Sequence, residues 1–257
     1  MQINLNADLG ESFGAWRMGD DAALLQVVNS ANLACGFHAG DPLVMTQTVR
    51  AAVAARVEVG AHPALPDLQG FGRRVMHLAP AELRAAVLYQ IGALAAIAAS
   101  EGARVAHVKP HGALSHLSWR DAATARVIAE AVRDTGAGLI LLAPARSALA
   151  EAGQAAGLPV ALEAFADRAY AADGTLAPRD QPGAVLTDTA ACIAQARAML
   201  ARGGLLTAQG ECLPTPIHSL CVHGDTPHAA ATARALREAL VADGWRPAGL
   251  AAVLATG

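Results

Sequence analysis

The sequence is short of aromatic residues, which make up only 4% of the 257 residues although 54% of them are hydrophobic. Much of the hydrophobic content is alanine. Alanine-rich runs favour helices packed closely on a sheet, whereas a β-sandwich is rich in β-branched and aromatic residues. The shortage of aromatics therefore favours an α/β fold. The length suits one large α/β barrel or two small domains, and it is ample for a sizeable core.

Cysteine is also scarce, and the four that occur, Cys35, Cys192, Cys212 and Cys221, form no CxxC pair. A zinc knuckle is therefore not expected, and a disulfide scaffold is not typical of a chain of this size. The first residues lack the basic start and apolar run of a signal peptide. No segment offers the ~18 apolar residues of a membrane-spanning helix. We expect a cytoplasmic protein with free thiols and no membrane partner.

The sequence lacks strong charge of either sign, with a formal net charge of −3 and a pI near 6.3. No basic patch indicates a nucleic-acid partner, and no charged tail indicates a disordered arm. No GxxxxGK[ST] motif is present, which excludes a P-loop nucleotide site.

Short β-like runs alternate with helical stretches along the whole chain. Strands are expected at residues 3–8, 31–34, 57–61, 104–109, 139–143, 159–163 and 219–223, and the main helices at 42–56, 80–102, 121–134, 189–202 and 227–243. This alternation predicts a parallel sheet with right-handed crossovers. We interpret residues 1–257 as a single α/β domain, a distorted or incomplete (β/α) barrel of about seven parallel strands. An open doubly wound sheet is the alternative.

Polar residues occupy one face of the first strand. Because side chains alternate along a strand, Asn6 and Asp8 point away from the aliphatic face of Ile3 and Leu5. A face of amides and a carboxylate fits a polar interior. In the same way, Lys109 lies opposite the aliphatic face of its strand.

Titratable residues also follow the other strands. They are Glu11 after the first strand, His38 after the second, His62 after the third, His111 after Lys109, and His223 and Asp225 at the last. Active sites of parallel α/β folds form at the carboxyl ends of the strands, and such sites concentrate titratable groups. We therefore expect these residues to share one polar site.

Other candidate features have two readings each. The segment Gly70–Arg74 could cradle an anion with its backbone N–H groups, Arg73 and Arg74, or be an ordinary glycine loop with solvated arginines. The pair Asp167–Arg168 could be a loop ion pair or a substrate clamp. Cys35 could be a nucleophile beside His38, although a small buried thiol is more typical.

A metal site is a further reading. His38, His62 and His223 with Asp8 could bind a divalent ion, but their sequence spacing neither supports nor excludes it. The other four histidines are expected at the surface: His77, His116, His218 and His228.

Several long motifs resemble the LamB/YcsF family, which comprises the A subunit of the bacterial ATP-dependent 5-oxoprolinase. They are Asn6–Gly14, Ser30–Pro42, Gly60–Pro63, Pro66–Arg74, Val108–Leu114, Phe165–Tyr170 and Cys221–Asp225, in family order. Ser115 stands where the family usually has tyrosine, so a pocket shaped by that tyrosine would fit its substrate differently here.

The resemblance implies a distorted (β/α) barrel like that of the glycoside hydrolase/deacetylase group. It also implies cleavage of 5-oxo-L-proline to L-glutamate driven by ATP hydrolysis, with Mg²⁺ as a metal that could accompany ATP. The family enzyme works with two further subunits, B and C, so this chain alone is expected to be inactive.

A chemical hypothesis follows from this resemblance. Asp8 or Glu11 would be the base, and His62, His111 or His223 would carry protons. Lys109 and Arg73 or Arg74 would contact anionic oxygens. The residues assigned to substrate or phosphate binding are Asn6, His38, Arg73, Arg74, Asp167, Arg168 and Asp225.

Two alternatives from other classes remain open. The chain could be a metal-dependent hydrolase or deacetylase that acts alone, with Asp8 and the histidines as ligands. It could also be a lactam-binding subunit that hands its ligand to a partner and carries no chemistry.

Overall fold

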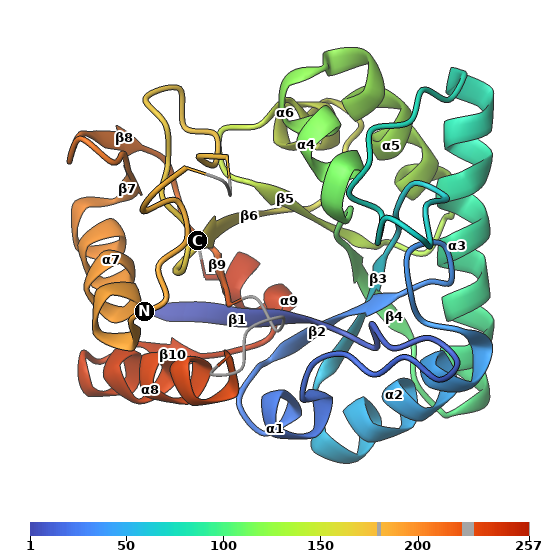
Figure 1. Ribbon diagram of the computed structural model, residues 1–257, viewed down its shortest axis with the longest axis horizontal. Coiled ribbons are helices and arrows are strands. Elements are labelled where there is room, and N and C mark those ends of the chain that lie inside the picture. Colours follow the sequence, from blue (N-terminus) through green and yellow to red (C-terminus); the bar gives the residue numbers. More distant parts are fainter. Residues whose placement is uncertain (179–180, 223–228, 257) are drawn as a thin grey trace.

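Seven parallel strands close into a barrel in the computed structural model, which describes residues 1–178, 181–222 and 229–256 (Figure 1). Within these ranges the barrel strands are β1 (Gln2–Leu9), β2 (Ser30–Ala34), β3 (Glu58–His62), β4 (Val105–Val108), β5 (Ile140–Pro144), β6 (Val160–Phe165) and β9 (Ser219–Cys221). Each pairs with the next, and β9 pairs back onto β1, which closes the ring. The predicted barrel of about seven parallel strands is confirmed, and the open sheet is excluded.

Helices surround this ring (Figure 1). They are α1 (Asp21–Leu25), α2 (Pro42–Ala55), α3 (Pro80–Ser100), α4 (Gly112–Arg120), α5 (Ala122–Asp134), α6 (Ala148–Ala155), α7 (Thr189–Arg202), α8 (Ala229–Ala242) and α9 (Leu250–Leu254). Four features were not predicted from the sequence: α4, α9, the antiparallel hairpin of β7 (Gly204–Leu206) and β8 (Cys212–Pro214), and the short strand β10 (Arg246–Pro247), which pairs with the start of β1.

Capping residues set the beginnings of the helices. Asp41 accepts hydrogen bonds from the backbone N–H groups of Leu43 and Val44, at 2.9 and 3.0 Å, and Pro42 occupies the first turn. Aspartate satisfies the free N–H groups of a first turn, and proline needs no partner there.

The helix α3 corrects one expectation about hydrophobic segments. By length and composition alone, its 21 residues could cross a membrane. Glu82 and Arg84 are the charged residues in it, both near its beginning. The apolar residues Leu83, Val87, Ile91 and Leu94 are buried in the core of the barrel wall. Such a buried face is typical of a helix that covers a sheet.

The interior of the barrel is polar, and its outer face is apolar. Ile3, Leu5 and Ala7 belong to the hydrophobic core, whereas Asn4 and Asn6 are fully buried and bond to other polar side chains. The predicted alternation along the first strand is therefore confirmed.

The chain's last helix closes the amino-terminal end of the barrel. Leu250 is fully buried with Ile140, Leu142 and Ala161 in a small separate cluster, and its N–H donates to Glu58 at 2.9 Å. The cavity lies at the opposite end of the barrel, at the carboxyl ends of the strands.

Candidate active site

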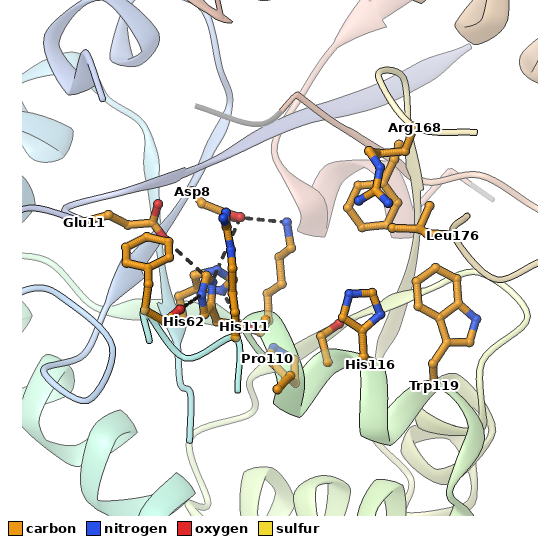
Figure 2. Close-up of a pocket in the computed structure, with 16 residues that line it drawn as sticks. Asp8, Glu11, His62, Pro110, His111, His116, Trp119, Arg168 and Leu176 are labelled. Atoms are coloured by element: carbon orange, nitrogen blue, oxygen red, sulfur yellow. Dashed lines mark hydrogen bonds and ion pairs between the residues drawn. The ribbon is translucent and has the colours of Figure 1, made fainter. Parts of the chain in front are cut away.

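A cavity of about 260 Å³ opens at the carboxyl ends of the strands. Asp8 and Glu11 line it from β1 and the loop after it, His62 from the end of β3, Lys109 from just after β4 and Arg168 from the loop after β6 (Figure 2). His111, at the beginning of α4, also lines it. The structure thus brings together most of the residues that the strand-end argument selected.

Lys109 lies at the floor of this cavity among four acceptors. Its Nζ is 3.0 Å from Asp8 Oδ1, 3.0 Å from Glu163 Oε1, 3.2 Å from Asn6 Oδ1 and 3.2 Å from Cys221 Sγ. Burial by itself would lower the pKa of Lys109, but the Asp8 and Glu163 carboxylates raise that pKa well above its ordinary value. Lys109 is therefore a fixed positive charge and not a base.

Asn6 links Lys109 to the polar side chains inside the barrel. Its Nδ2 donates to Glu163 Oε1 and to Ser219 Oγ, both at 2.8 Å. Its Oδ1 accepts from Asn32 Nδ2 at 2.8 Å and from Lys109. Because Asn6 is fully buried and all these atoms are engaged, it positions the charged groups instead of facing the cavity.

Glu163 was not predicted from the sequence, although it is central to the network. It lies on β6 with 1% exposure, and its Oε2 has no hydrogen-bond partner among the described residues. A carboxylate near the end of an otherwise apolar strand was the available signal, because such a group is buried only when it is paired.

Three histidines and a glutamate form a compact cluster beside Lys109. His38 Nε2 is 3.2 Å from Glu11 Oε1, His111 Nδ1 is 3.6 Å from the same oxygen, and His111 Nδ1 is 3.0 Å from His62 Nε2. One ligand atom from each of the four residues lies within 4.8 Å of the others. Imidazole and carboxylate groups bind divalent transition metals, so this cluster can hold a metal ion.

The membership of this cluster differs from the metal set considered from sequence. Glu11 and His111 join His38 and His62, while Asp8 contacts the cluster through His62 Nε2 at 3.3 Å. His223, with Asp225 and His228, lies outside the described residues.

Burial keeps two of these histidines neutral. It lowers the pKa of His38 and of His111 well below the ordinary value, and neighbouring imidazoles lower both further. Neutral imidazoles present a lone pair on one ring nitrogen, which is the form that binds metals or accepts protons.

The segment after β3 packs over the histidines. Gly72 has φ +65°, and a Cβ there would lie 2.9 Å from atoms of both His38 and His111. The backbone carbonyl of Phe71 accepts from His111 Nε2 at 2.9 Å. Gly72 therefore allows close approach to the imidazole rings, which is a local reason for a glycine here besides anion binding.

The two arginines of this loop have different surroundings. Arg73 lines the cavity, with its guanidinium 5.1 Å from the Phe71 ring centroid. Arg74 instead donates to Asp67 through Nε at 2.8 Å and lowers the pKa of that carboxyl. Arg74 therefore holds the loop together.

Asp167 and Arg168 follow β6 and are both buried. Arg168 lines the cavity and donates from Nη2 to Ala177 O at 2.6 Å and from Nε to Ala184 O at 3.2 Å. Figure 2 shows it across the cavity from Glu11 and the histidines. Its guanidinium plane is thus fixed by backbone carbonyls.

Several other residues that line the cavity were not predicted from the sequence. Figure 2 shows Trp119 and Leu176 on the same side of the cavity as Arg168, and Phe165 and Ser115 also belong to the lining. His116 is exposed, as expected, but it is also in the lining. Ser115 and His116 belong to α4, a helix that the local sequence pattern did not predict.

Cys35 is a buried thiol. Its Sγ donates to Leu33 O at 3.1 Å, and burial raises its pKa to about 12. A neutral buried thiol is a poor nucleophile, so the structural reading of Cys35 is supported.

The sequence pattern of the LamB/YcsF family matches residues 3–255. The chain belongs to this family. LamB/YcsF relatives include the A subunit of 5-oxoprolinase from Azoarcus sp. strain BH72, which is 62% identical over 97% of this chain and 98% of its own length. The corresponding 5-oxoprolinase subunit of Methylococcus capsulatus is 59% identical over 94% of this chain and 93% of its own length.

Solved structures show the same barrel. The lactam utilization protein from Thermus thermophilus superposes with a TM-score of 0.91 at 46% identity, over 97% of this chain and 100% of that one. The T48 deacetylase superposes with a TM-score of 0.51 at 11% identity, covering 99% of this chain and 91% of that one, which shows a shared fold alone.

Proposed function

We propose that this LamB/YcsF chain is the subunit of an ATP-dependent 5-oxoprolinase that holds 5-oxo-L-proline while the lactam is opened to L-glutamate. The names of relatives at 59% and 62% identity support this proposal. The observation that carries it is the small cavity whose lining contains Arg168 and the ion pair of Asp8 with Lys109. Figure 2 shows Arg168 across this cavity from Asp8. A small anionic amide needs such a pairing of catalytic groups and a carboxylate-binding cation.

The reaction requires activation of a poor electrophile. Phosphorylation of the amide oxygen by ATP breaks the γ-phosphoryl bond, releases ADP and gives the ring carbon a phosphate leaving group. Water then attacks that carbon, and the ring C–N bond of the tetrahedral adduct breaks to give an open-chain acyl phosphate. A second water hydrolyses this acyl phosphate to L-glutamate and phosphate. We assign Lys109 and Arg73 to the developing negative charge, and Asp8 or Glu11 to the base that takes the proton of water.

Proton transfer to the ring nitrogen needs a second titratable group. His62 and His111 line the cavity and are assigned to this step, and His223 remains a candidate outside the described residues. Asn6 and His38 are absent from the cavity lining, so we assign them to positioning. Asp167 is assigned to the support of Arg168, and Asp225 stays a predicted substrate contact.

Arg168 is our candidate for the substrate carboxylate. Two backbone carbonyls hold its guanidinium, so little side-chain freedom is lost when a ligand binds. Phe165, Trp119 and Leu176 would cover the apolar ring carbons beside it.

We propose that only the terminal phosphate of ATP, with its Mg²⁺, enters the cavity, and that the rest of the nucleotide lies outside it. A cavity of about 260 Å³ suits a small lactam, and a whole nucleotide needs more room. We therefore propose that subunits B and C contribute to the nucleotide site. Use of ATP and the free thiols of Cys35, Cys192 and Cys221 fit a cytoplasmic protein.

The test is a glutamate-release assay with 5-oxoproline, run with the chain alone and with subunits B and C, each with and without ATP. We expect glutamate only when ATP and all subunits are present. Glutamate release by the chain alone without ATP would favour a stand-alone metal-dependent hydrolase.

An active-site variant separates catalysis from simple binding. In the assembled complex, Asp8→Asn should lower turnover at least ~10²-fold, the low end for an acid–base group, with Asp134→Asn as an exposed control. Unchanged turnover in folded Asp8→Asn, with lactam binding retained, would favour a binding subunit without its own chemistry. We expect the same loss for His223→Gln.

A further inference from the structure

Backbone carbonyls fix the hydrogens of two histidines in the cluster. His62 Nδ1 lies 2.6 Å from Lys109 O, and His111 Nε2 lies 2.9 Å from Phe71 O. A carbonyl oxygen only accepts hydrogen bonds, so both of these nitrogens carry hydrogen. In the neutral rings, the lone pairs are then on His62 Nε2 and His111 Nδ1.

These two lone pairs face each other at 3.0 Å. Asp8 Oδ2 is 3.3 Å from His62 Nε2, and Glu11 Oε1 is 3.6 Å from His111 Nδ1. All four atoms are acceptors, so their approach is repulsive unless something positive lies among them. A single proton bridges only one pair, whereas a metal ion accepts several lone pairs at once.

His38 completes the group. Its Nε2 is 3.2 Å from Glu11 Oε1, and its Nδ1 is buried without a hydrogen-bond partner in the described part of the chain. No described carbonyl therefore fixes its tautomer, and Nε2 can present a lone pair. Its ring stacks on His111, with centroids 3.8 Å apart and planes at 8°.

The spacing of the ligand atoms fits a small four-coordinate ion. Bonds of about 2.0–2.1 Å in tetrahedral geometry place neighbouring ligand atoms about 3.3 Å apart. Three of the six separations, 3.0, 3.2 and 3.6 Å, are close to this value, and all six are within 4.8 Å. The carbonyl partners of His62 and His111 match the outer shell that orients metal-binding imidazoles.

The donor set selects the class of ion. Three imidazole nitrogens and one carboxylate suit zinc and related transition metals, while Mg²⁺ and Ca²⁺ prefer oxygen ligands. The carboxylate of Glu11 belongs to this donor set and that of Asp8 lies beside it, and anionic oxygens are ligands that such cations accept.

We propose that Glu11, His38, His62 and His111 bind one zinc-type divalent ion, a centre separate from any Mg²⁺ that accompanies ATP. Glu11, His62 and His111 line the cavity, so the ion would lie in its wall beside Asp8 (Figure 2). This proposal does not depend on the 5-oxoprolinase proposal, because the coordination argument uses no substrate. When the ion is bound, Glu11 and the lone pairs of His62 and His111 are occupied, and the base and proton-transfer roles of the proposed function fall to Asp8 and His223.

The test is metal binding by the purified full chain, stripped with a chelator, without lactam, ATP or partner subunits. We expect calorimetry to give one zinc ion per chain, and cobalt substitution to give the visible absorption of a tetrahedral site. Glu11→Gln, His62→Gln and His111→Gln should each weaken zinc binding at least ~10-fold, since outer-shell changes alone reach that size. His77→Gln, an exposed histidine elsewhere, should bind as the unmodified chain does.

Circular dichroism checks that each variant is folded. Absence of a tetrahedral cobalt spectrum in the unmodified chain, or tighter binding of Mg²⁺ than of zinc, would overturn the proposal without any variant. Unweakened zinc binding in folded Glu11→Gln and His62→Gln would overturn it as well. Glutamate release is not measured, so failure here leaves the proposed function to its own test.

Discussion

Lys109 keeps its charge inside the barrel because acceptors surround it on all sides. Its Nζ contacts Asp8, Glu163, Asn6 and Cys221, and the side chain is 7% exposed. A buried ammonium is stable only when its hydrogen bonds and counter-charges are in place. The same acceptors depend on Lys109, because without it the carboxylates of Asp8 and Glu163 would lose the positive charge that pairs with both.

Replacement of this charge should therefore destabilise the fold as well as the site. Lys109→Met should lower the free energy of unfolding by about 3–5 kcal/mol, the range for breaking a buried ion pair. Arg50→Met is the matched control, because Arg50 pairs with Glu101 at 2.8 Å while 66% exposed, and such pairs contribute about 1 kcal/mol or less. Denaturant titration measures both. Equal losses in the two variants would contradict the central role of Lys109.

At the scale of elements, the loop after β3 and the beginning of α4 position the histidine cluster together. Ala113 N donates to Gly72 O at 2.9 Å, and His111 precedes α4 directly. Gly72 packs against His38 and His111 without room for a Cβ. The loop and the helix are thus one structural unit, although they are far apart in the sequence.

The substitution Gly72→Ala tests this unit. An alanine at the positive φ of Gly72 should lower the free energy of unfolding by roughly 1–2 kcal/mol, and displacement of the His38 and His111 rings should lower it further. Gly136→Ala is the control, because Gly136 has φ +66° and a Cβ added there would meet nothing within 4 Å. We expect denaturation to show the larger loss for Gly72→Ala, and metal titration to show weakened binding only there. If both variants bind metal alike, the packing of Gly72 does not hold the cluster.

The helix α9 closes the amino-terminal end of the barrel, and a substitution in it tests whether the two ends are independent. Leu250→Ala removes a fully buried side chain from this helix and should lower the free energy of unfolding by about 2–5 kcal/mol. Because α9 lies at the end opposite the cavity, substrate affinity should change little. Calorimetric lactam titration of the folded variant checks this, and strongly reduced affinity would show that the two ends are coupled.

At the scale of the whole molecule, a polar barrel interior makes stability depend on pH. His107 is fully buried, and its Nε2 donates to Asn32 Oδ1 at 2.8 Å. Burial, with smaller effects of Lys109 and His62, lowers its pKa to about 3. The unfolded chain binds this proton below about pH 6.5, so it holds more protons than the folded chain between these values.

Stability from His107 is therefore fully present above about pH 6.5 and is lost as the pH falls toward 3, by at most about 1.4 kcal/mol per pH unit. His107→Gln can keep the donor to Asn32 but does not titrate. Its free energy of unfolding should fall less steeply between pH 7 and pH 5, measured by denaturant titration. Parallel slopes in the two proteins would show that His107 does not contribute.

Much of the architecture was predictable, because it follows from short-range rules. Side-chain alternation placed Asn6, Asp8 and Lys109 on the inner face of the barrel, and the cap at Asp41 set the beginning of α2. The single domain over residues 1–257 stays a prediction. The helix α4, which was not predicted, begins at Gly112 with φ +52°, which is unusual for a helix start and weakens the local signal.

The sequence by itself determined the family, the alternating strands and the edge of the barrel at which titratable residues gather. Only the tertiary structure decided which residues meet there: Glu11 and His111 with the other two histidines, Glu163 beneath Lys109, and Arg74 turned to Asp67. The physical reason is the range of the interactions. Strand periodicity and helix caps act between near neighbours, whereas a shared site depends on how a closed barrel brings distant strand ends within a few ångströms of each other.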